Sequence, residues 1–296
     1  MASRAVPWSA FPKRDQPADS PIRVLSHPDT AALRALVDRD PVANVFMAAQ
    51  LDQHASAVPS VLGAQTVGYF ADDGELLAAC WVGANVIPLG VTERLAPTFG
   101  DYLSRLGRRH ASIYGPAEAV LNIFRRLSEL GFRAAEIREC QPLMAMAGES
   151  SLDPAPGLQP SLMDSFDQIL PAAVAMFEEE VGYSPYLGGE EFYRRRVANL
   201  IRQGHSLSHL DQRGEVIFKA DLGAVSRQAS QVQGVWLRPD QRGLGLSAGY
   251  MAAVVRLARQ LAPVVSLYVN DYNTKALASY QRVGFERIGT FATVLF

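Results

Sequence analysis

Two glycines and an arginine lie where an apolar run ends and a helical pattern begins. The run 234–237 (GVWL) is followed by Arg242, Gly243 and Gly245, and then by an amphipathic stretch at 247–260. The first N–H groups of a helix have no internal partner, and the helix dipole adds partial positive charge there. Glycines let an anion approach those groups, and an arginine adds a charge-assisted contact. The spacing therefore predicts an anion cradle, in which each N–H contributes roughly 1.5–3 kcal/mol toward a charged acceptor.

Other glycine loops fit the sequence less well. No Gly-Lys-Ser/Thr follows the turn, which argues against a nucleoside triphosphate loop of the Walker type. No Gly-x-Gly-x-x-Gly opens a parallel strand–helix–strand unit, which argues against a dinucleotide site. The prediction is therefore a diphosphate held at the start of one helix.

Composition sets the broad class. The chain has 296 residues, 48% of them hydrophobic, which allows two globular domains. Its net charge of −2 argues against nucleic acid and membrane surfaces as partners. Residues 1–20 lack a continuous apolar segment and predict a flexible tail, not a secretory signal. Cys80 and Cys140 have no metal-type spacing, and no histidine set suggests a metal, so we expect buried thiols in a cytoplasmic protein without metal.

The segment 148–160 is the best candidate for a linker. It is rich in Gly, Ser, Pro and Asp and has little to bury (GESSLDPAPGLQP). It leaves a first unit at 21–147 and a second unit at 161–296. The periodicity of the second unit predicts helices and strands in this order: helices 167–181 and 189–203, hairpin strands 205–210, 215–223 and 231–237, a helix to 260, a strand 264–269, a helix 274–283, and terminal strands 285–289 and 290–296.

The two units end in the same pattern. A helix closes at Gly131–Phe132 in the first unit and at Gly284–Phe285 in the second, and the preceding order of elements also repeats. This repetition predicts an old duplication. The first unit has no Arg-Gly-x-Gly turn, and it carries Leu127 and Val120 where the second has Tyr280 and Asn273. Only the second unit is therefore expected to perform chemistry, with the first as a scaffold or lid.

The second unit resembles a known family. VWLRPDQRGLGLSAGYM followed by VSLYVNDYNTKALASYQRVGF resembles the acetyl-CoA-binding core of the GCN5-related N-acetyltransferases (GNAT). The resemblance covers 231–296 well and the rest of the unit by strand order. Ser247 departs from the small apolar residue of the family. The two-unit layout resembles actinobacterial tandem GNAT proteins with a degenerate N-terminal half. The implied fold is α+β: two tandem GNAT-like domains, each a central, mostly antiparallel sheet flanked by helices. The positions that carry the resemblance are Arg242, Gly245, Ser247, Asn273, Ala276, Tyr280, Gly284 and Phe285.

The resemblance also implies roles for single residues. A main-chain N–H near Trp236 or Leu237 would meet the thioester carbonyl of acetyl-CoA, and Tyr280 would be the general acid. A phenol with a pKa near 10 can protonate a thiolate and still be protonated at neutral pH. Asn273 would bind the pantetheine arm, cap its own helix, or do both. The cofactor-binding turn comprises Arg242, Gly243, Leu244, Gly245, Leu246 and Ser247.

The general base is less well defined. The fourth strand of the second unit offers only Gln231 and Gln233, which cannot take a proton. Carboxylates of the run 178–180 are the preferred candidates, Glu179 and Glu180 foremost, although three consecutive acids usually form a solvated helix end. The other residues weighed were His205, His209 and Asp221 as alternative bases, Tyr183 and Tyr186 as walls of the amine site, and Arg194 to Arg196 as a solvated face or a contact to the CoA 3′-phosphate.

The sequence thus predicts an acetyl-CoA-dependent N-acetyltransferase acting on a primary amine of a protein or a small metabolite. An enzyme like mycothiol synthase is an alternative within the same class. A non-catalytic acetyl-CoA sensor is the alternative from another class, because the strand-four glutamate is missing. The expected partner is the acceptor amine, and a homodimer is left open.

Overall fold

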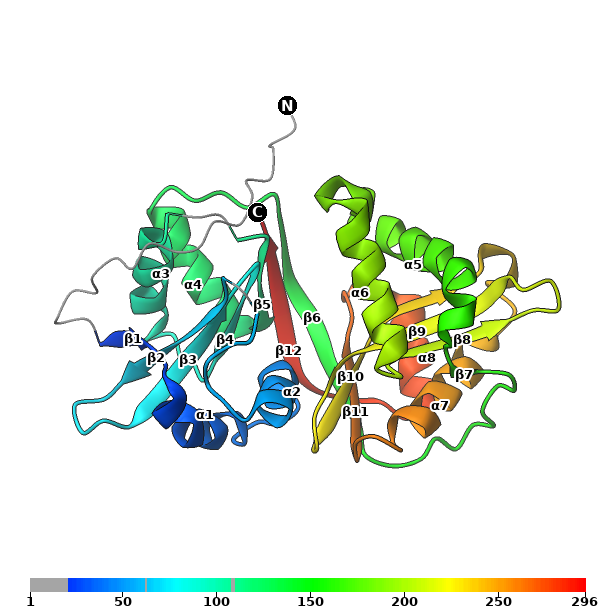
Figure 1. Ribbon diagram of the computed structural model, residues 1–296, viewed down its shortest axis with the longest axis horizontal. Helices are drawn as coiled ribbons and strands as arrows, with labels where there is room; N and C mark the ends of the chain where they lie inside the picture. Colours follow the sequence, from blue (N-terminus) through cyan, green and yellow to red (C-terminus); the bar gives the residue numbers. More distant parts are fainter. Residues whose placement is uncertain (1–20, 62, 108–109) are drawn as a thin grey trace. The chain divides into compact units, whose positions relative to one another are not determined.

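The computed structural model describes residues 21–61, 63–107 and 110–296, which divide into two compact units (Figure 1). Of the described residues, the N-terminal unit comprises those in the range 21–143 together with 268–272 and 287–296. The C-terminal unit consists of 144–267 and 273–286.

The two halves of the described sequence follow one order of strands and α-helices: a strand, two helices, three strands, a helix, a strand, a helix and a strand. The first set is β1 (Ile22–Val24), α1 (Thr30–Val37), α2 (Val45–His54), β2 (Gln65–Phe70), β3 (Leu76–Val82), β4 (Asn85–Leu89), α3 (Ala96–Arg105), β5 (Ser112–Pro116), α4 (Ala117–Glu129) and β6 (Glu136–Met146). The second set is β7 (Gln159–Pro160), α5 (Phe166–Val181), α6 (Glu190–Arg202), β8 (Ser206–Leu210), β9 (Val216–Val225), β10 (Ala229–Leu237), α7 (Leu246–Ala258), β11 (Val264–Tyr268), α8 (Thr274–Val283) and β12 (Glu286–Leu295). The repeated order agrees with the duplication that the sequence predicts.

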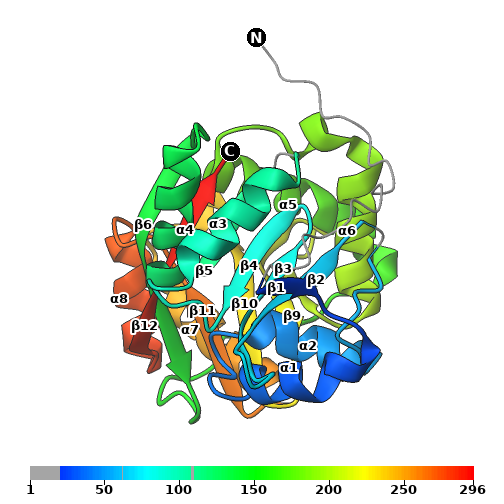
Figure 2. The same ribbon diagram turned by 90° about the vertical axis from the view of Figure 1, so that its left-hand side faces the viewer.

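In the N-terminal unit the strands run in the order β1-β2-β3-β4-β5-β12-β6. β4 and β5 are parallel, whereas β1–β2, β2–β3, β3–β4 and β5–β12 are antiparallel. Helices α3 and α4 pack on one core, and α1 and α2 pack on another (Figure 2). Val120 and Leu127 of α4 are buried in the first core. They are packing residues, which explains why this unit has apolar side chains at those positions.

The last strand belongs to the N-terminal unit. Residues 291–295 of β12 pair antiparallel with 112–116 of β5, and Ala292 and Val294 are fully buried there. The second unit predicted from the sequence, 161–296, includes this strand, because pairing between distant strands leaves no local signal in the sequence. The two predicted terminal strands are also one continuous strand, β12. A cut after residue 147 would leave β12 without β5.

The predicted linker is partly folded onto the C-terminal unit. The Ala155 N–H donates to the Gly249 carbonyl at 2.8 Å, Leu158 is buried, and β7 pairs with β8. A Cβ at Gly249 would lie 3.6 Å from the Cβ of Ala155, so the extended segment is in close contact with α7 at this point. The composition of 148–160 marks it as extended, but its packing depends on α7.

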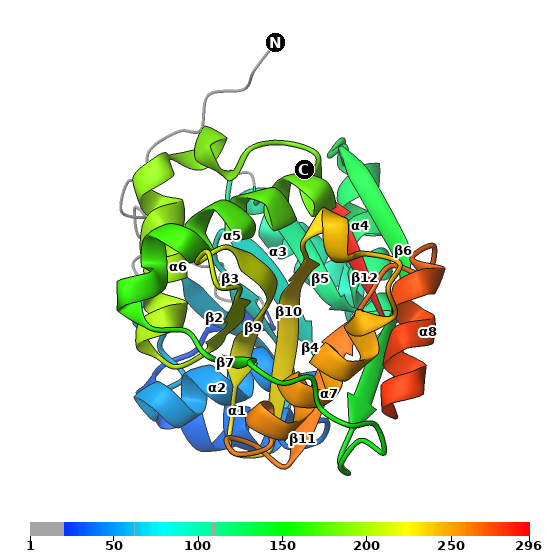
Figure 3. The same cartoon turned by 90° about the vertical axis from the view of Figure 1, so that its right-hand side faces the viewer.

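In the C-terminal unit the strands run in the order β11-β10-β9-β8-β7. α5 and α6 cover one face, and α7 lies on the other, where the rings of Phe218 and Tyr250 stack at 4.5 Å (Figure 3). β10 is antiparallel to β9 and parallel to β11. The pairing with β11 covers only 229–231, so 232–237 pair with β9 alone within the described part of the chain. The mostly antiparallel α+β sheets predicted from the sequence are confirmed.

The two cysteines differ in their surroundings. Cys80 in β3 is buried, and its burial raises the pKa of the thiol. Cys140 in β6 is half-buried, so the prediction of two buried thiols holds for Cys80 alone. The reason is that the first half of β6 is largely exposed. No helix in the described residues is both long and apolar enough to cross a membrane.

We expect that replacing the core-facing Val294 of β12 by Asp will unfold the N-terminal unit. Val294 is 0% exposed, so the carboxylate would be buried without a partner, at a cost of about 3–5 kcal/mol. Ile288→Asp in the same strand is the matched control, because Ile288 is 51% exposed and its replacement costs about 0.5 kcal/mol or less. Urea unfolding, with hydrogen exchange of the β5 amides, measures both effects. Equal losses in the two variants would contradict the assignment of β12.

Candidate functional site

The turn between β10 and α7 has the backbone that the sequence predicts. After β10 the chain makes a short 3-10 helix, η4 (Pro239–Gln241), and then passes through Gly243 (φ 79°) and Gly245 (φ 77°). Both angles lie in the left-handed region, which side chains with a Cβ seldom adopt. A Cβ at either glycine would meet no described atom within 4 Å. The glycines are therefore required by the backbone conformation, and the space above them is open.

The amides of this turn are accessible. The segment 242–246 is exposed, with Leu244 at 64%. Within the described residues, no hydrogen bond uses the N–H groups of Gly243, Leu244 or Gly245. Ser247, the second residue of α7, is half-buried. The exposed N–H groups at the start of α7 can bind an anion, because the helix dipole adds positive charge at the same point.

The equivalent helix of the N-terminal unit lacks this feature. At the start of α3 the N–H groups of Leu95 and Ala96 both donate to the carbonyl of Thr92 at 3.0 Å. Pro97 then contributes no N–H at all. Leu95 has an ordinary right-handed conformation. These N–H groups at the start of α3 are therefore already hydrogen-bonded within the chain, and fewer of them are available to bind an anion than at α7.

Arg242 and Glu179, predicted for different roles, are partners. One guanidinium nitrogen of Arg242, Nη2, lies 2.9 Å from both carboxylate oxygens of Glu179, and its Nε donates to the Leu237 carbonyl at 2.8 Å. The indole N–H of Trp236 also donates to Glu179, at 3.2 Å. Both members of the ion pair are nearly half exposed, at 44% and 47%, so the pair contributes about 0–1 kcal/mol. Arg242 and Glu179 can therefore each exchange the other for a different partner at little cost in free energy.

Tyr280 of α8 is a buried, neutral phenol. Its side chain packs edge-on against Phe285, and the residue is 9% exposed. Burial is the main cause that raises its pKa to about 12, and the negative charge of Glu180 raises it further. The raised value keeps the phenol protonated at neutral pH, as a general acid requires. The carboxylate of Glu180, at the end of α5, therefore interacts electrostatically with the Tyr280 phenol.

Asn273 caps the helix that carries Tyr280. Its side-chain oxygen accepts from the Ala276 N–H at 3.2 Å, at the start of α8. The capping role weighed from the sequence is therefore present. A role toward a pantetheine arm stays a prediction.

The other candidates for a base have different surroundings. His205 is half-buried, and burial lowers its pKa; the ring of His209 shares a hydrogen bond with the Tyr250 hydroxyl at 2.7 Å. Tyr183, beyond the end of α5, is 53% exposed, and Tyr186 is partly buried.

Two of the three arginines at 194–196 in α6 have carboxylate partners. Arg194 lies 3.9 Å from Asp167, and Arg195 donates to Glu191 at 3.0 Å. These contacts agree with a solvated helix face. A contact to a CoA phosphate stays a prediction.

Sequence reasoning missed one buried charged residue of the C-terminal unit. Lys219 in β9 is 0% exposed, and its ammonium donates to Asp221 at 2.7 Å and to the carbonyl of Gly234 at 3.1 Å. The available signal was a lysine and an aspartate two residues apart inside an apolar strand (EVIFKADLG), which places both on one face.

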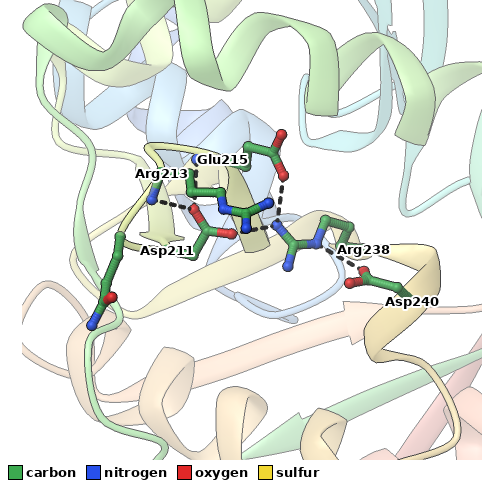
Figure 4. Close-up of a pocket in the computed structure, with 6 residues that line it drawn as sticks. Asp211, Arg213, Glu215, Arg238 and Asp240 are labelled. Carbon is green, nitrogen blue, oxygen red and sulfur yellow. Dashed lines mark hydrogen bonds and ion pairs between the residues drawn. The ribbon is translucent and has the colours of Figure 1, made fainter.

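A pocket of about 530 Å³ lies at the turn between β8 and β9 (Figure 4). Its centre is Arg238, which bridges Asp211, Glu215 and Asp240 at 2.7–3.1 Å. The hydrogen bond from Arg238 is the main cause that lowers the pKa of Asp211 to about 2. These charges satisfy one another and fasten the turn to the end of β10. The pocket contains none of the predicted site residues. No metal-binding group of three or more His, Cys, Asp or Glu occurs in residues 21–61, 63–107 and 110–296.

Two family models match the sequence. The acetyltransferase (GNAT) family matches residues 173–285, and a domain of unknown function (DUF4081) matches residues 64–169. No curated protein matches the chain.

Solved structures with the same fold cover most of the chain. A GCN5-related N-acetyltransferase from Sphaerobacter thermophilus has 16% identity and a TM-score of 0.57, covering 92% of this chain and 94% of that one. A GNAT-family acetyltransferase from Colwellia psychrerythraea has 11% identity and a TM-score of 0.56, covering 93% and 99%. A tandem GNAT protein from the clavulanic acid biosynthesis pathway has 12% identity and a TM-score of 0.54, covering 92% and 98%. At these identities the likeness establishes the fold.

We expect Tyr280 to stay protonated when ordinary tyrosines ionise. With a pKa of about 12 in the folded protein and about 10 in the unfolded chain, its un-ionised form is favoured by folding. The stability due to this group is therefore lost as the pH rises from about 10 to about 12. At pH 10.5, Tyr280→Phe should show the same tyrosinate absorbance at 295 nm as the parent protein. A deficit of one tyrosinate in the variant would contradict the raised pKa.

Proposed function

Because the acetyltransferase (GNAT) family model matches residues 173–285, we propose that this region transfers an acetyl group from acetyl-CoA to a primary amine. The observation that carries the proposal is the open glycine turn before α7. It lies in the family-matched region, together with the buried neutral phenol of Tyr280. Acetyl-CoA is the donor substrate, and it supplies an activated thioester.

The turn suits a diphosphate. Gly243 and Gly245 hold the chain in left-handed conformations that no Cβ obstructs, and the amides of 243–245 are exposed. Leu246 and Ser247 begin the helix whose dipole adds positive charge. Arg242 adds a cation that can leave its exposed partner. These groups would bind the diphosphate of acetyl-CoA by charge-assisted hydrogen bonds.

The reaction is a direct displacement at the thioester carbonyl. The amine nitrogen forms a bond to the carbonyl carbon while the carbon–sulfur bond breaks. The amine loses one proton to a carboxylate, and the sulfur leaves as a thiolate that gains one proton to become CoA. A main-chain N–H of β10 near Trp236 or Leu237 would stabilise the negative charge on the carbonyl oxygen. Atoms and charge balance without any oxidant or metal.

Tyr280 is the proposed proton donor, and its raised pKa limits how it acts. A phenol with a pKa of about 12 is a weaker acid than an ordinary thiol with a pKa near 8.5. Complete transfer of the phenol proton to the sulfur, before the amine proton arrives, is therefore uphill by roughly 5 kcal/mol. We therefore propose that Tyr280 donates a hydrogen bond to the departing sulfur. The phenol proton is transferred fully to the sulfur once the proton lost by the amine reaches Tyr280 through water and the carboxylate.

Glu179 is the proposed base, with Glu180 as the second carboxylate. Arg242 and Trp236 both donate to Glu179, so its position is defined. A diphosphate bound at the turn would compete with Glu179 for the Arg242 guanidinium. Since the exposed pair contributes only about 0–1 kcal/mol, a doubly charged ligand can displace it. The binding of the donor substrate would thereby release the carboxylate that takes the amine proton.

The surroundings of these carboxylates fit a cationic acceptor. Glu178 and Glu180 are exposed beside Glu179 at the end of α5, and the exposed ring of Tyr183 follows. Their charge would attract an ammonium group, and the ring adds an apolar surface. We propose a primary amine, of a protein or a small molecule, as the acceptor class; it arrives as an ammonium ion and gives one proton to water, and the neutral amine then attacks.

Replacing Tyr280 by Phe should abolish most thiol release and spare donor binding. General acid catalysis contributes about 10²–10⁴-fold to a rate, so release of CoA from acetyl-CoA across a panel of primary amines should fall by that factor. The Kd for CoA by calorimetry should stay within about twofold, because a phenyl ring fills the same space.

Tyr272→Phe is the matched control, because Tyr272 is 69% exposed, and it should behave as the parent. Unchanged thiol release in Tyr280→Phe would rule out the acid role. Binding of acetyl-CoA without thiol release from any amine, in the parent itself, would favour the sensor.

Replacing Glu179 by Gln should separate transfer from binding. Loss of the base should lower thiol release about 10²-fold or more, whereas CoA should bind as well or up to about fivefold tighter, because Arg242 no longer has a competing carboxylate partner. Glu178→Gln, an exposed neighbour, is the control. Equal effects of the two substitutions on thiol release would remove Glu179 from the mechanism.

A further inference from the structure

Lys219 and Asp221 form a buried ion pair on β9. The Lys219 ammonium lies 2.7 Å from an Asp221 oxygen, and the two residues are 0% and 6% exposed. Charges this deep in a protein are costly unless they are paired and hydrogen-bonded. Even a well-made buried pair seldom stabilises a fold more than apolar residues of equal size. Stability alone therefore does not explain why this strand carries the pair.

The pair faces an irregularity in the neighbouring strand. Asp221 is opposite Gln233, and Lys219 is opposite Trp236, so three steps along β10 match two along β9. This is a β-bulge, which leaves one residue of the longer strand outside the ladder. Residues 232–237 have no β11 partner in the described structure either. Within the described structure, Gly234 and Val235 therefore have no register partner on β9 or β11.

Gly234 is the residue through which the pair acts on the bulge. Its φ is 59°, in the left-handed region, and its carbonyl accepts from the Lys219 ammonium at 3.1 Å. A Cβ on Gly234 would lie 3.1 Å from an Asp221 oxygen and from the methyl carbon of Met176. The orientation of this peptide is thus set by a charge and by close packing, in place of a ladder bond. Trp236, two residues on, donates to Glu179.

We propose that Lys219 and Asp221 are positioning residues that hold the β10 bulge so that one of its main-chain N–H groups stays available to the thioester carbonyl of acetyl-CoA. Lys219 fixes the Gly234 carbonyl, and Asp221 fixes the Lys219 ammonium. Neither side chain exchanges a proton with the substrates. The inference rests on the proposed function for its ligand, but it assigns a task to residues that the reaction itself does not use.

The test is the carbonyl stretch of bound acetyl-CoA carrying ¹³C at the thioester carbon. In the parent protein a hydrogen bond from the bulge should lower this frequency below that of free acetyl-CoA. The double variant Lys219→Met with Asp221→Asn removes both charges at nearly constant volume. It should still bind acetyl-CoA, its bound carbonyl should return to the free frequency, and thiol release should fall about 10²-fold. A merely structural role would not move the carbonyl frequency of a bound ligand.

The matched control is Arg34→Met with Asp52→Asn, which removes an ion pair of 2.8 Å in the N-terminal unit. It should leave the frequency lowered. If the double variant at 219 and 221 does not fold, Gly234→Ala distorts the bulge while keeping the charges, and it should also restore the free frequency. A lowered frequency in either folded variant, or a free frequency in the parent with ligand bound, overturns the inference. Failure of the parent to bind acetyl-CoA overturns the proposed function instead.

Discussion

The start of α7 imposes the constraint from which the rest of the C-terminal unit follows. A helix leaves its first N–H groups without partners, and they must find a carbonyl, a side chain, water or a ligand. Here Gly243 and Gly245 turn the chain through left-handed conformations, so these groups face open space. At α3 the Thr92 carbonyl takes the corresponding bonds. One structural choice, glycine turn or internal bond, therefore separates a helix that can bind an anion from one that is closed.

Glu179 connects this turn to the remainder of the site. It accepts from Arg242 in the turn and from Trp236 at the end of β10, although it lies in α5. A residue expected to hold the donor and one expected to deprotonate the acceptor thus share an ion pair. Because the pair is nearly half exposed, its members can change partners at little cost. This provides a physical route by which binding of the donor substrate can influence the carboxylate.

The two units show how one order of elements supports different capacities. Both have a parallel pair of strands at the same place in the order, β4–β5 and β10–β11. Val120 and Leu127 of α4 fill a core of the N-terminal unit. At the corresponding positions of the second half, Asn273 caps α8 and Tyr280 is a buried phenol within α8. The N-terminal unit in turn contains the last strand of the chain, which pairs with β5. The N-terminal unit therefore has no glycine turn of this kind before α3, and its sheet includes a strand from the other end of the sequence.

Local chemistry in the sequence determined a large part of this protein. Left-handed glycines, the Asn273 cap, the helical period around Tyr280 and the alternation of strands with helices all depend on residues close together in the chain, so they can be recognised there. The tertiary structure alone decided the partners that lie far apart: β12 beside β5, Ala155 on Gly249, Glu179 on Arg242, and Lys219 on the Gly234 carbonyl. Those contacts depend on which strand edges and helix ends meet after folding, and no local pattern of residue types records that.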